Sequence, residues 1–256
     1  MIKVEEIIKD YQPPKKKFFS LKPSEETTRA VDKISFECKP GRVFSLLGPN
    51  GAGKTTTLRM IATILKPNAG KISVNGFDVV SNANDVRKSI GFLTGSTGLY
   101  ARLTVNEVIK YFADLNGLDA VTFKNRKEEL FGLLGMNDFA DKKIGSLSTG
   151  MKQKVSIART IIHNPPVVVF DEPTSGLDVI TASAIIELIQ RCKTENKTVI
   201  FSSHIMSEVE LLCDDLAIMH KGKIVFEGTM DSFRIQMQSP NITQDFIRLI
   251  KQHDNA

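Results

Sequence analysis

The chain has 256 residues, of which 41% are hydrophobic, and a formal net charge of +5. This length predicts one large domain or a core with a smaller subdomain, and the composition is sufficient for a sizeable core. The longest uninterrupted apolar runs span only residues 167–170 and 216–219, whereas a membrane-spanning helix needs about 20 apolar residues. The N-terminus has no signal-peptide pattern, and the mild charge does not by itself imply nucleic acid binding. We therefore expect a soluble, intracellular chain that binds no nucleic acid.

The cysteines agree with a reducing compartment. Cys38, Cys192 and Cys213 are scattered and share no metal-binding or CxxC spacing. The simplest interpretation is that all three are small buried apolar residues.

The N-terminal part of the chain has the pattern of strands. Residues 1–10 alternate as in a strand that ends at Tyr11, and residues 12–29 form a polar loop. The cluster Lys15-Lys16-Lys17 in this loop indicates a solvated segment, with contact to an anionic membrane surface as the alternative. The ranges 31–38 and 43–47, joined by Pro40-Gly41, predict a hairpin.

The middle of the chain changes from strands to helices. A helix is expected at 54–65, a strand at 71–74 followed by the turn Asn75-Gly76, and a short strand at 90–93. Thr104 and Glu107 form a capping box that opens a helix. Helices are expected at 104–116, 119–134 and 150–163.

The second half alternates strands and helices, which is typical of an α/β fold. Residues 167–170 are apolar in succession, which predicts a strand buried on both faces of a parallel sheet. Further strands are expected at 198–201, 216–219 and 223–227, and helices at 181–192, 206–213 and 242–251.

The sequence Gly48-Pro49-Asn50-Gly51-Ala52-Gly53-Lys54-Thr55-Thr56 fits the phosphate-binding loop pattern G-x-x-x-x-G-K-[ST]. It stands between an expected strand and an expected helix, as the pattern requires. Glycines let the backbone curl around a phosphate, and the loop N–H groups with the helix N-terminus attract an anion. Lys54 is predicted to contact the β- and γ-phosphates, and the Thr55 hydroxyl to bind Mg²⁺. The alternative is a glycine-rich turn without a nucleotide.

A pair of carboxylates closes the most apolar strand. Asp171 is predicted to hold Mg²⁺, and Glu172 to orient and deprotonate an attacking water. The alternative is a surface carboxylate pair at a strand end.

Together these motifs resemble the nucleotide-binding subunit of an ABC transporter, over nearly the whole chain. The resemblance rests on five motifs in order: residues 48–56, Leu147-Ser148-Thr149-Gly150-Met151, the strand that ends at Asp171-Glu172, Ser175-Gly176-Leu177-Asp178, and His204. It implies a phosphate-loop NTPase core with a mainly parallel sheet, an N-terminal antiparallel β subdomain and an inserted α-helical subdomain. It also implies a single ATPase domain over residues 1–256. The core would comprise 1–95 and 151–230, the helical insert 96–150, and a helical tail 231–256.

The resemblance also assigns residues. Residues 147–151 match the family signature, which implies that Ser148 and Gly150 contact the γ-phosphate of ATP held by a second subunit paired head to tail. Thr149 and Met151 depart from the usual Gly and Gln. Asp178 would lie in the loop that crosses the dimer interface, and His204 matches the switch histidine. Tyr11 matches the aromatic residue that stacks on adenine, with Phe18 and Phe19 as competitors; alternatively, Tyr11 only ends a strand.

One position departs from the family pattern. The usual Gln after the strand at 90–93 aligns with Gly95, which has no side chain to bind a metal. We predict that water replaces that ligand, rather than Ser96 or Thr97. The ranges 91–100 and 148–154 are similar to the Nat-type sodium-exporting branch of ABC exporters.

The resemblance therefore implies an ATPase with ATP and Mg²⁺ as cofactors. It would energise export through a separate membrane-spanning subunit, from the inner face of the membrane. The branch suggests sodium ions as the cargo, with a drug, a peptide or a lipid as the alternatives. Intact motifs favour two identical nucleotide-binding subunits. The alternative is an ATP-driven switch that regulates a partner protein without transport.

Overall fold

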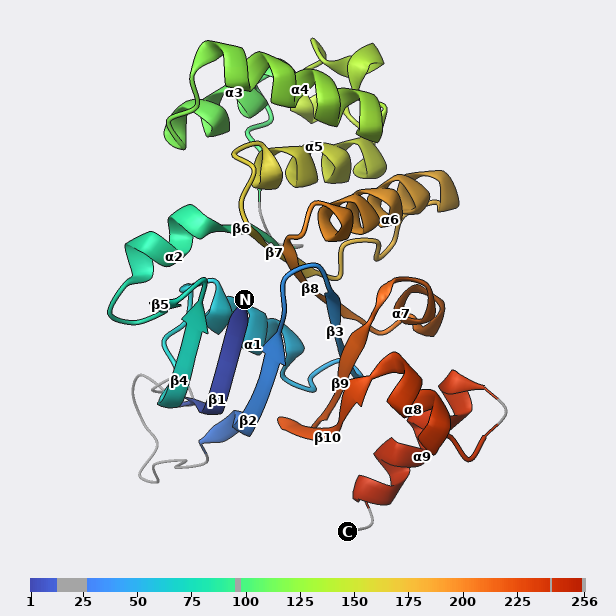
Figure 1. Ribbon diagram of the computed structural model, residues 1–256. Coiled ribbons are helices and arrows are strands. Elements are labelled where there is room, and N and C mark those ends of the chain that lie inside the picture. The colour runs from blue at the N-terminus through green and yellow to red at the C-terminus, as the bar shows by residue number, and fades with distance from the viewer. Residues whose placement is uncertain (13–26, 95–97, 240, 255–256) are drawn as a thin grey trace, which may run out of the picture.

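A computed structural model describes residues 1–12, 27–94, 98–239 and 241–254. The described residues form two sheets with helices around and above them (Figure 1). The antiparallel sheet has the order β2-β1-β4-β5 and consists of β1 (Ile2–Tyr11), β2 (Thr28–Cys38), β4 (Ala69–Val74) and β5 (Phe77–Asp78).

The second sheet has the order β10-β9-β3-β8-β7-β6, and only β10 runs antiparallel to its neighbour. Its strands are β3 (Val43–Leu47), β6 (Ile90–Leu93), β7 (Val167–Asp171), β8 (Thr198–Ser203), β9 (Asp215–His220) and β10 (Lys223–Thr229). This sheet and its neighbour confirm the predicted α/β class with a mainly parallel sheet and an N-terminal antiparallel part.

The helices of the described residues are α1 (Lys54–Ile61), α2 (Ala83–Ser89), α3 (Val105–Leu115), α4 (Ala120–Leu134), α5 (Thr149–Ile161), α6 (Val179–Thr194), α7 (Met206–Leu212), α8 (Met230–Gln236) and α9 (Ile242–Asp254). Short 3-10 helices lie at Asn137–Phe139 and Ile144–Ser146. In Figure 1, α3, α4 and α5 lie at the top, above α6, while α8 and α9 lie beside β9 and β10 at the lower right.

The core has two parts that meet at the parallel sheet. Val168 and Phe170 of β7 pack with the helices α3 to α6, whereas Val167 and Val169 pack with α1 and the antiparallel sheet. All four side chains are fully buried. The expected burial of this strand on both faces is therefore confirmed, and it fixes the position of the residues that follow the strand.

The predicted hairpin of 31–38 and 43–47 is wrong. β2 pairs with β1 in the antiparallel sheet, whereas β3 pairs with β8 and β9 in the other sheet. Because β3 is a central strand with both edges occupied, no edge is left for β2. The connection at Pro40-Gly41 therefore crosses between sheets, and the Gly41 N–H donates to the Lys197 carbonyl just before β8.

Smaller differences concern helices. The first helix ends at Ile61 rather than Leu65, because Thr63 adopts a φ of 62°, which breaks the helical backbone. α2 and α8 are seven residues long, and the sequence pattern did not indicate them. The capping box of Thr104 and Glu107 is present at the start of α3.

No helix in the described ranges is long and apolar enough to cross a membrane.

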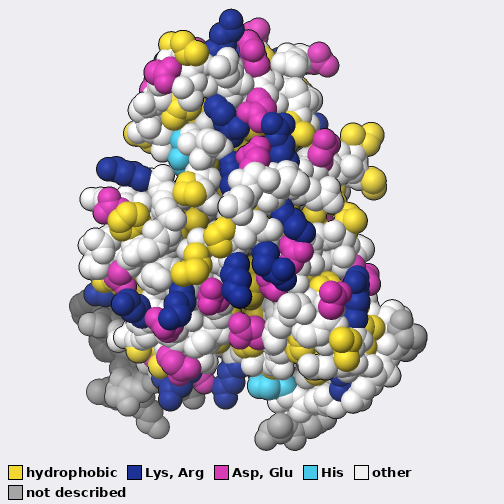
Figure 2. Space-filling view, viewed as in Figure 1, with side chains coloured by type: hydrophobic (Ala, Val, Ile, Leu, Met, Phe, Trp, Pro, Cys, Tyr) yellow, Lys and Arg dark blue, Asp and Glu magenta, His cyan; other side chains and the backbone are white. Residues whose placement is uncertain are grey.

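Charged side chains of both signs are mixed on the face shown in Figure 2, and no large area of one sign dominates it. No charged patch therefore marks a binding site on this face.

Candidate nucleotide-binding site

The predicted phosphate loop connects β3 to α1. Gly53 precedes the helix with a φ of 104°, and a Cβ built on it would lie 2.5 Å from the Ala30 carbonyl oxygen. A Cβ at Gly48 would lie 2.4 Å from the Met219 carbonyl oxygen. Such approaches exclude any side chain at either position. The loop sequence is thus fixed by its own packing as well as by the anion that it would hold.

The loop encloses a cavity of about 150 Å³. Its lining comes mainly from the loop itself: Ala30, Asn50, Gly51, Ala52, Gly53, Lys54, Thr55, Thr56 and Glu172. The N-terminus of α1 has no side-chain cap, so its free N–H groups face an anion site of the kind found at helix N-termini. Ala30 of β2 was missed by the sequence analysis, because nothing local marks an alanine as a lining residue.

Lys54 is 5% exposed, and its Nζ donates hydrogen bonds to the carbonyl oxygens of Gly48 at 2.6 Å and Pro49 at 3.0 Å. Its Nζ also lies 3.9 Å from the Glu172 Oε1. Burial lowers the pKa of the lysine, while the nearby carboxylates of Glu172 and Asp171 oppose that shift. The two carboxylates therefore help to keep a buried cation charged.

Asp171 is the last residue of β7 and lies beside Thr55. The Thr55 Oγ1 donates to the Asp171 Oδ1 at 2.9 Å, and the Ser202 Oγ of β8 donates to the same oxygen at 2.7 Å. Oxygen donors of this kind suit Mg²⁺, which proteins bind through one or two carboxylates together with substrate phosphates. In the described ranges, no group of three or more His, Cys, Asp or Glu residues is placed to hold a metal without such phosphates.

Glu172 follows Asp171 with a φ of 49°, a left-handed backbone that is uncommon outside glycine. Its N–H donates to the Ser202 Oγ at 3.0 Å. Its Oε1 lies 3.2 Å from the Nδ1 of His204, which follows β8. Strain at a polar strand end is a frequent companion of catalytic function.

The structure thus brings together four predicted residues from three strand ends: Lys54 after β3, Asp171 and Glu172 at the end of β7, and His204 after β8. Carboxyl ends of parallel strands are the usual binding edge of α/β sheets. Ser202 belongs to the same cluster and was missed. The signal that could have found it is its place two residues before His204, at the end of a buried strand.

The signature residues form a separate cluster. Ser148 caps α5, where its Oγ accepts from the Met151 N–H at 3.3 Å, and Asp178 caps α6, accepting from the Thr181 N–H at 2.9 Å. This N–H and the Thr181 hydroxyl keep the pKa of Asp178 below its usual value. A Cβ at Gly150 would lie 3.4 Å from the Asp178 Oδ2. None of these residues lines the phosphate-loop cavity of the same chain.

Other predicted residues lie elsewhere. Tyr11 ends β1 opposite Thr28, is 40% exposed, and does not line the loop cavity; the Lys9 Nζ lies 5.7 Å from its ring centroid. Phe18, Phe19, the lysines 15–17, and Gly95 with its neighbours 96 and 97 fall outside the described residues. The cysteines Cys38, Cys192 and Cys213 are free and buried, and burial raises the pKa of each thiol.

A phosphate loop, a strand-end carboxylate pair and a histidine on adjacent parallel strands define a nucleotide-binding ATPase of the phosphate-loop class. The chain belongs to the ABC transporter family, whose model matches residues 31–175. Within this family it is an ATP-binding subunit with ATPase activity and is similar to Nat-type ABC ATPases.

Two relatives illustrate the similarity. The chain is 44% identical over 223 residues to the ABC transporter ATP-binding protein NatA of Bacillus subtilis, covering 87% of this chain and 91% of the relative. It is 37% identical to the bacitracin transport ATP-binding protein BcrA of Bacillus licheniformis, over 80% of this chain and 67% of the relative.

Solved structures agree. The ATP-binding subunit of an ABC transporter superposes with a TM-score of 0.84 at 26% identity, over 97% of this chain and 98% of that one. A dimeric post-hydrolysis structure of the ATP-binding cassette MJ0796, bound to ADP and Pi, gives a TM-score of 0.77 at 25% identity, over 90% and 99% of the two chains.

Proposed function

We propose that this chain is the ATP-hydrolysing subunit of an exporter and drives a separate membrane-spanning partner. The observation that carries its ATP-hydrolysing part is the convergence of Lys54, Asp171, Glu172 and His204 at the phosphate loop. Each of these groups has a role in phosphoryl transfer to water, in which catalysis is mostly positioning and charge stabilisation. The transport part of the proposal is supported by the similarity to the bacitracin transport ATP-binding protein.

The loop 48–56 holds the phosphates of ATP in this proposal. Its N–H groups and the N-terminus of α1 contact phosphate oxygens. Lys54 exchanges the carbonyls of Gly48 and Pro49 for the β- and γ-phosphates, whose charge outweighs that of two neutral acceptors. Thr55 and Asp171 hold Mg²⁺, which neutralises charge on the phosphates.

Glu172 acts as the general base. Its carboxylate accepts a proton from water while the water oxygen attacks the γ-phosphorus and the bond to the ADP oxygen breaks. The ring of His204 touches this carboxylate and contacts the γ-phosphate in the closed state. Because His204 contacts both the Glu172 carboxylate and, in the closed state, the γ-phosphate, loss of that phosphate on hydrolysis changes the contacts of His204.

The closed state needs a second subunit. We propose a head-to-tail pair of identical chains, in which Ser148 and Gly150 of one contact the ATP held by the other, and Asp178 crosses the interface. The caps of α5 and α6 lie side by side, and the adjoining Val179 and Ile180 are 85% and 81% exposed, as expected of an uncovered interface. Tyr11 is proposed to stack on adenine.

The helical insert 96–150 passes the motion to the membrane partner, while residues 1–95 and 151–230 form the core and 231–256 a tail. A groove of about 340 Å³ lies where the insert meets this core. Apolar side chains from both sides line it, including Ile64 at 57% exposure and Leu115 at 68%. Uncovered apolar residues at the junction of the insert and the core support docking of a segment of the partner there. In this proposal the chain therefore lies on the inner face of the membrane.

For the cargo we propose sodium ions. The support is the resemblance of residues 91–100 and 148–154 to the Nat-type branch. Export by a reconstituted complex of this chain and its partner, measured with a sodium-sensitive dye in vesicles, tests this choice. With ATP and sodium supplied outside, where this chain then lies, export should raise the sodium concentration inside the vesicles. No ATP-driven rise of internal sodium would remove sodium from the proposal.

The ATPase roles are tested by Glu172→Gln. The variant keeps the size and one acceptor of the side chain but loses the base, so turnover falls by about 10²-fold or more, while binding of a fluorescent ATP analogue persists. Glu210→Gln, on the exposed face of α7, is the matched control and retains turnover. Normal turnover of Glu172→Gln would remove that residue from the base role.

The transport part is tested by purifying the chain from its own cells in mild detergent and identifying what accompanies it. A multi-spanning protein in equal amount supports the exporter. A soluble partner, or no partner, would favour the ATP-driven switch without transport.

A further inference from the structure

A buried carboxylate contacts the loops that carry the proposed catalytic residues, and the proposed hydrolysis of ATP does not use it. Glu208 lies in the first turn of α7 and is only 9% exposed. The Thr174 hydroxyl donates to its Oε1, and the Ser203 hydroxyl donates to its Oε2 at 3.0 Å. Both oxygens of a carboxylate that burial would otherwise penalise are thus satisfied by hydroxyl groups.

The two hydroxyls come from the two loops that carry the catalytic pair. Thr174 lies two residues after Glu172, and Ser203 lies immediately before His204. The Ser203 Oγ also accepts from the Ile205 N–H at 3.0 Å, so it holds the backbone on both sides of His204. Glu208 therefore links both loops through hydrogen bonds that are separate from the 3.2 Å contact between Glu172 and His204.

This fastening matters because neither loop is fixed by regular structure. Glu172 has the strained φ of 49°, and His204 is exposed after the last residue of β8. Strained backbone persists only where surrounding contacts hold it. Without Glu208, the hydroxyls of Thr174 and Ser203 lose their common acceptor, and the two loops can shift independently.

We propose that Glu208 is a positioning residue for ATP hydrolysis, which fixes the loop of Glu172 relative to the loop of His204 through Thr174 and Ser203. The inference rests on the proposed roles of Glu172 and His204. Small displacements of a base from its reacting water reduce rate strongly, since the gain from orientation depends on near-attack geometry. Glu208 does not border the phosphate-loop cavity, so nucleotide affinity does not depend on it.

If Glu208 only stabilised the fold, the expected result would be different. An acidic side chain in the first turn favours the helix itself, so its removal would lower stability without changing the balance of kcat and KM. The test therefore uses Glu208→Gln, which keeps the shape, and Thr174→Val, which removes only the hydroxyl on one loop. Glu210→Gln, on the same helix and exposed, is the matched control.

For Glu208→Gln and Thr174→Val we expect kcat to fall roughly tenfold with KM for ATP nearly unchanged. The double variant is expected to be no worse than the worse single one, because both remove the same link. In the nucleotide-free chain, amide hydrogen exchange at residues 172–176 and 203–206 becomes faster in both variants, while exchange in α6 does not change.

A kcat for Glu208→Gln equal to that of Glu210→Gln would overturn the inference, as would a KM that rises by as much as kcat falls. If Glu208→Gln does not fold, the same criteria apply to Thr174→Val. Glu172→Gln in the same assay distinguishes a failure of the proposed base role from a failure of the inference about Glu208. If it turns over normally, the base role fails and the inference falls with it; if it is inactive while the Glu208 and Thr174 variants are normal, only the inference fails.

Discussion

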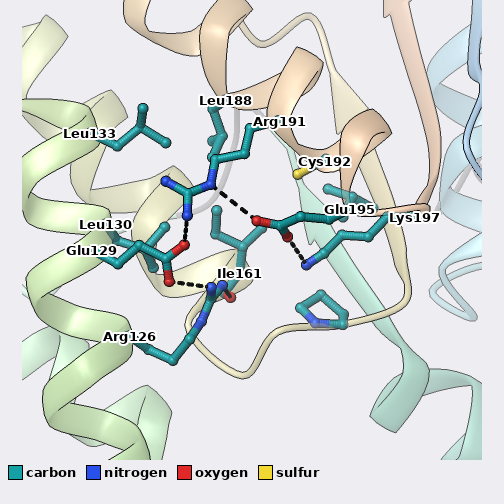
Figure 3. Close-up of a pocket in the computed structure, with 12 residues that line it drawn as sticks. Arg126, Glu129, Leu130, Leu133, Ile161, Leu188, Arg191, Cys192, Glu195 and Lys197 are labelled. Carbon is teal, nitrogen blue, oxygen red and sulfur yellow. Dashed lines mark hydrogen bonds and ion pairs between the residues drawn. The ribbon is translucent and has the colours of Figure 1, made fainter.

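Two charged regions of this molecule differ in how they are built. The first, the strand-end cluster, consists of Lys54, Asp171, Glu172, Ser202 and His204 at the carboxyl ends of three strands. The second, the helix seam, joins α4 to α6 and is shown in Figure 3; it consists of Arg126, Glu129, Arg191, Glu195 and Lys197.

The helix seam has more ion pairs. The Glu129 carboxylate pairs with Arg126 at 2.6 Å and also with Arg191, and Glu195 pairs with Arg191 at 3.0 Å. These side chains are long, and that of Arg191 is 42% exposed. The cavity among them measures about 10 Å³, which is room for about one water molecule. The seam can join two helices, but it cannot hold a ligand.

The strand-end cluster has fewer charges and more constraint. Ser202 is fully buried, and its hydroxyl accepts from the Glu172 N–H and donates to the Asp171 carboxylate. Glu172 keeps a φ of 49° there. In the seam, Asn196 next to Glu195 has a φ of 58°, but asparagine adopts this region more readily than glutamate does. In this molecule, therefore, buried hydroxyls and strained backbone at strand ends indicate the functional site better than the number of charges does.

Gly53→Ala should give the largest effect, since it acts on the loop that anchors the cluster. At a φ of 104° its Cβ would meet the Ala30 carbonyl at 2.5 Å, so the loop must move and ATP binding is lost. Gly117→Ala is the matched control: Gly117 also has a positive φ, of 72°, but open space around it. It should cost about 1–2 kcal/mol of stability and leave ATP binding intact, as measured by titration with a fluorescent ATP analogue. Binding by Gly53→Ala at normal affinity would contradict the assigned packing.

Ser202→Ala removes a central hydroxyl of the cluster. The Glu172 N–H loses its acceptor and Asp171 loses a donor, so we expect a loss of about 1–3 kcal/mol in the free energy of unfolding and lower ATP turnover. Ser45→Ala, on the adjacent strand β3, is the control. Its Oγ is equally buried but has no hydrogen-bond partner among the described residues, so its loss should change stability by no more than about 0.5 kcal/mol. Equal effects in urea unfolding would remove the special role of Ser202.

The sequence predicts the cluster better than its surroundings. The loop 48–56 and the pair Asp171-Glu172 follow local patterns whose residue types are required by backbone geometry and charge, and each lies where its strand ends. Ser202 acts through contacts with Asp171 and Glu172, and Glu208 through its contact with Thr174, all 30 or more positions away in the chain. No local pattern reports such distant contacts. The same limit explains the wrong hairpin: the pattern of 31–38 and 43–47 indicates strands but not their partners.

Helices show a similar division. Long helices with caps, such as α3 and α4, were predicted within a few residues, because capping and apolar periodicity are local signals. The helices α2, α7 and α8 are each seven residues long, and only α7 was predicted. About two helical turns carry a weak apolar periodicity, so tertiary packing decides whether such short segments are helical. Whether water takes the place of the usual Gln at Gly95 stays a prediction.

The helix seam should respond weakly to substitution. Arg191→Met keeps the apolar stem beside Leu188 and Cys192 but removes the charge that pairs with Glu129 and Glu195. We expect a loss below about 1 kcal/mol in thermal or urea unfolding, a smaller difference at high salt, and unchanged ATP turnover. A turnover loss as large as that of Ser202→Ala would erase the distinction between the two regions.

The smallest effect is expected for a surface pair at the far end of the chain. Lys221 and His220 hold the pKa of Asp254 down to about 2, and these contacts fasten α9 to the end of β9. Because the folded pKa lies below the unfolded value of about 3.9, the ionised pair stabilises the folded state at all pH values above the unfolded pKa. That contribution is lost as pH falls through about 2.

Asp254→Asn should therefore lower the melting temperature slightly and equally at pH 7 and pH 5, and the difference from the parent chain should shrink only below about pH 4. Asp231→Asn is the control, since the Asp231 carboxylate is 88% exposed and its only described pair, with Arg234, is 3.7 Å long. If the difference in melting temperature between the parent chain and Asp254→Asn grew on acidification, the ionised carboxylate would not be the stabilising form of Asp254. If turnover also fell, the tail would have to be joined to the strand-end cluster through the β9–β10 turn, where the Gly222 N–H donates to the Ala52 carbonyl at 3.1 Å.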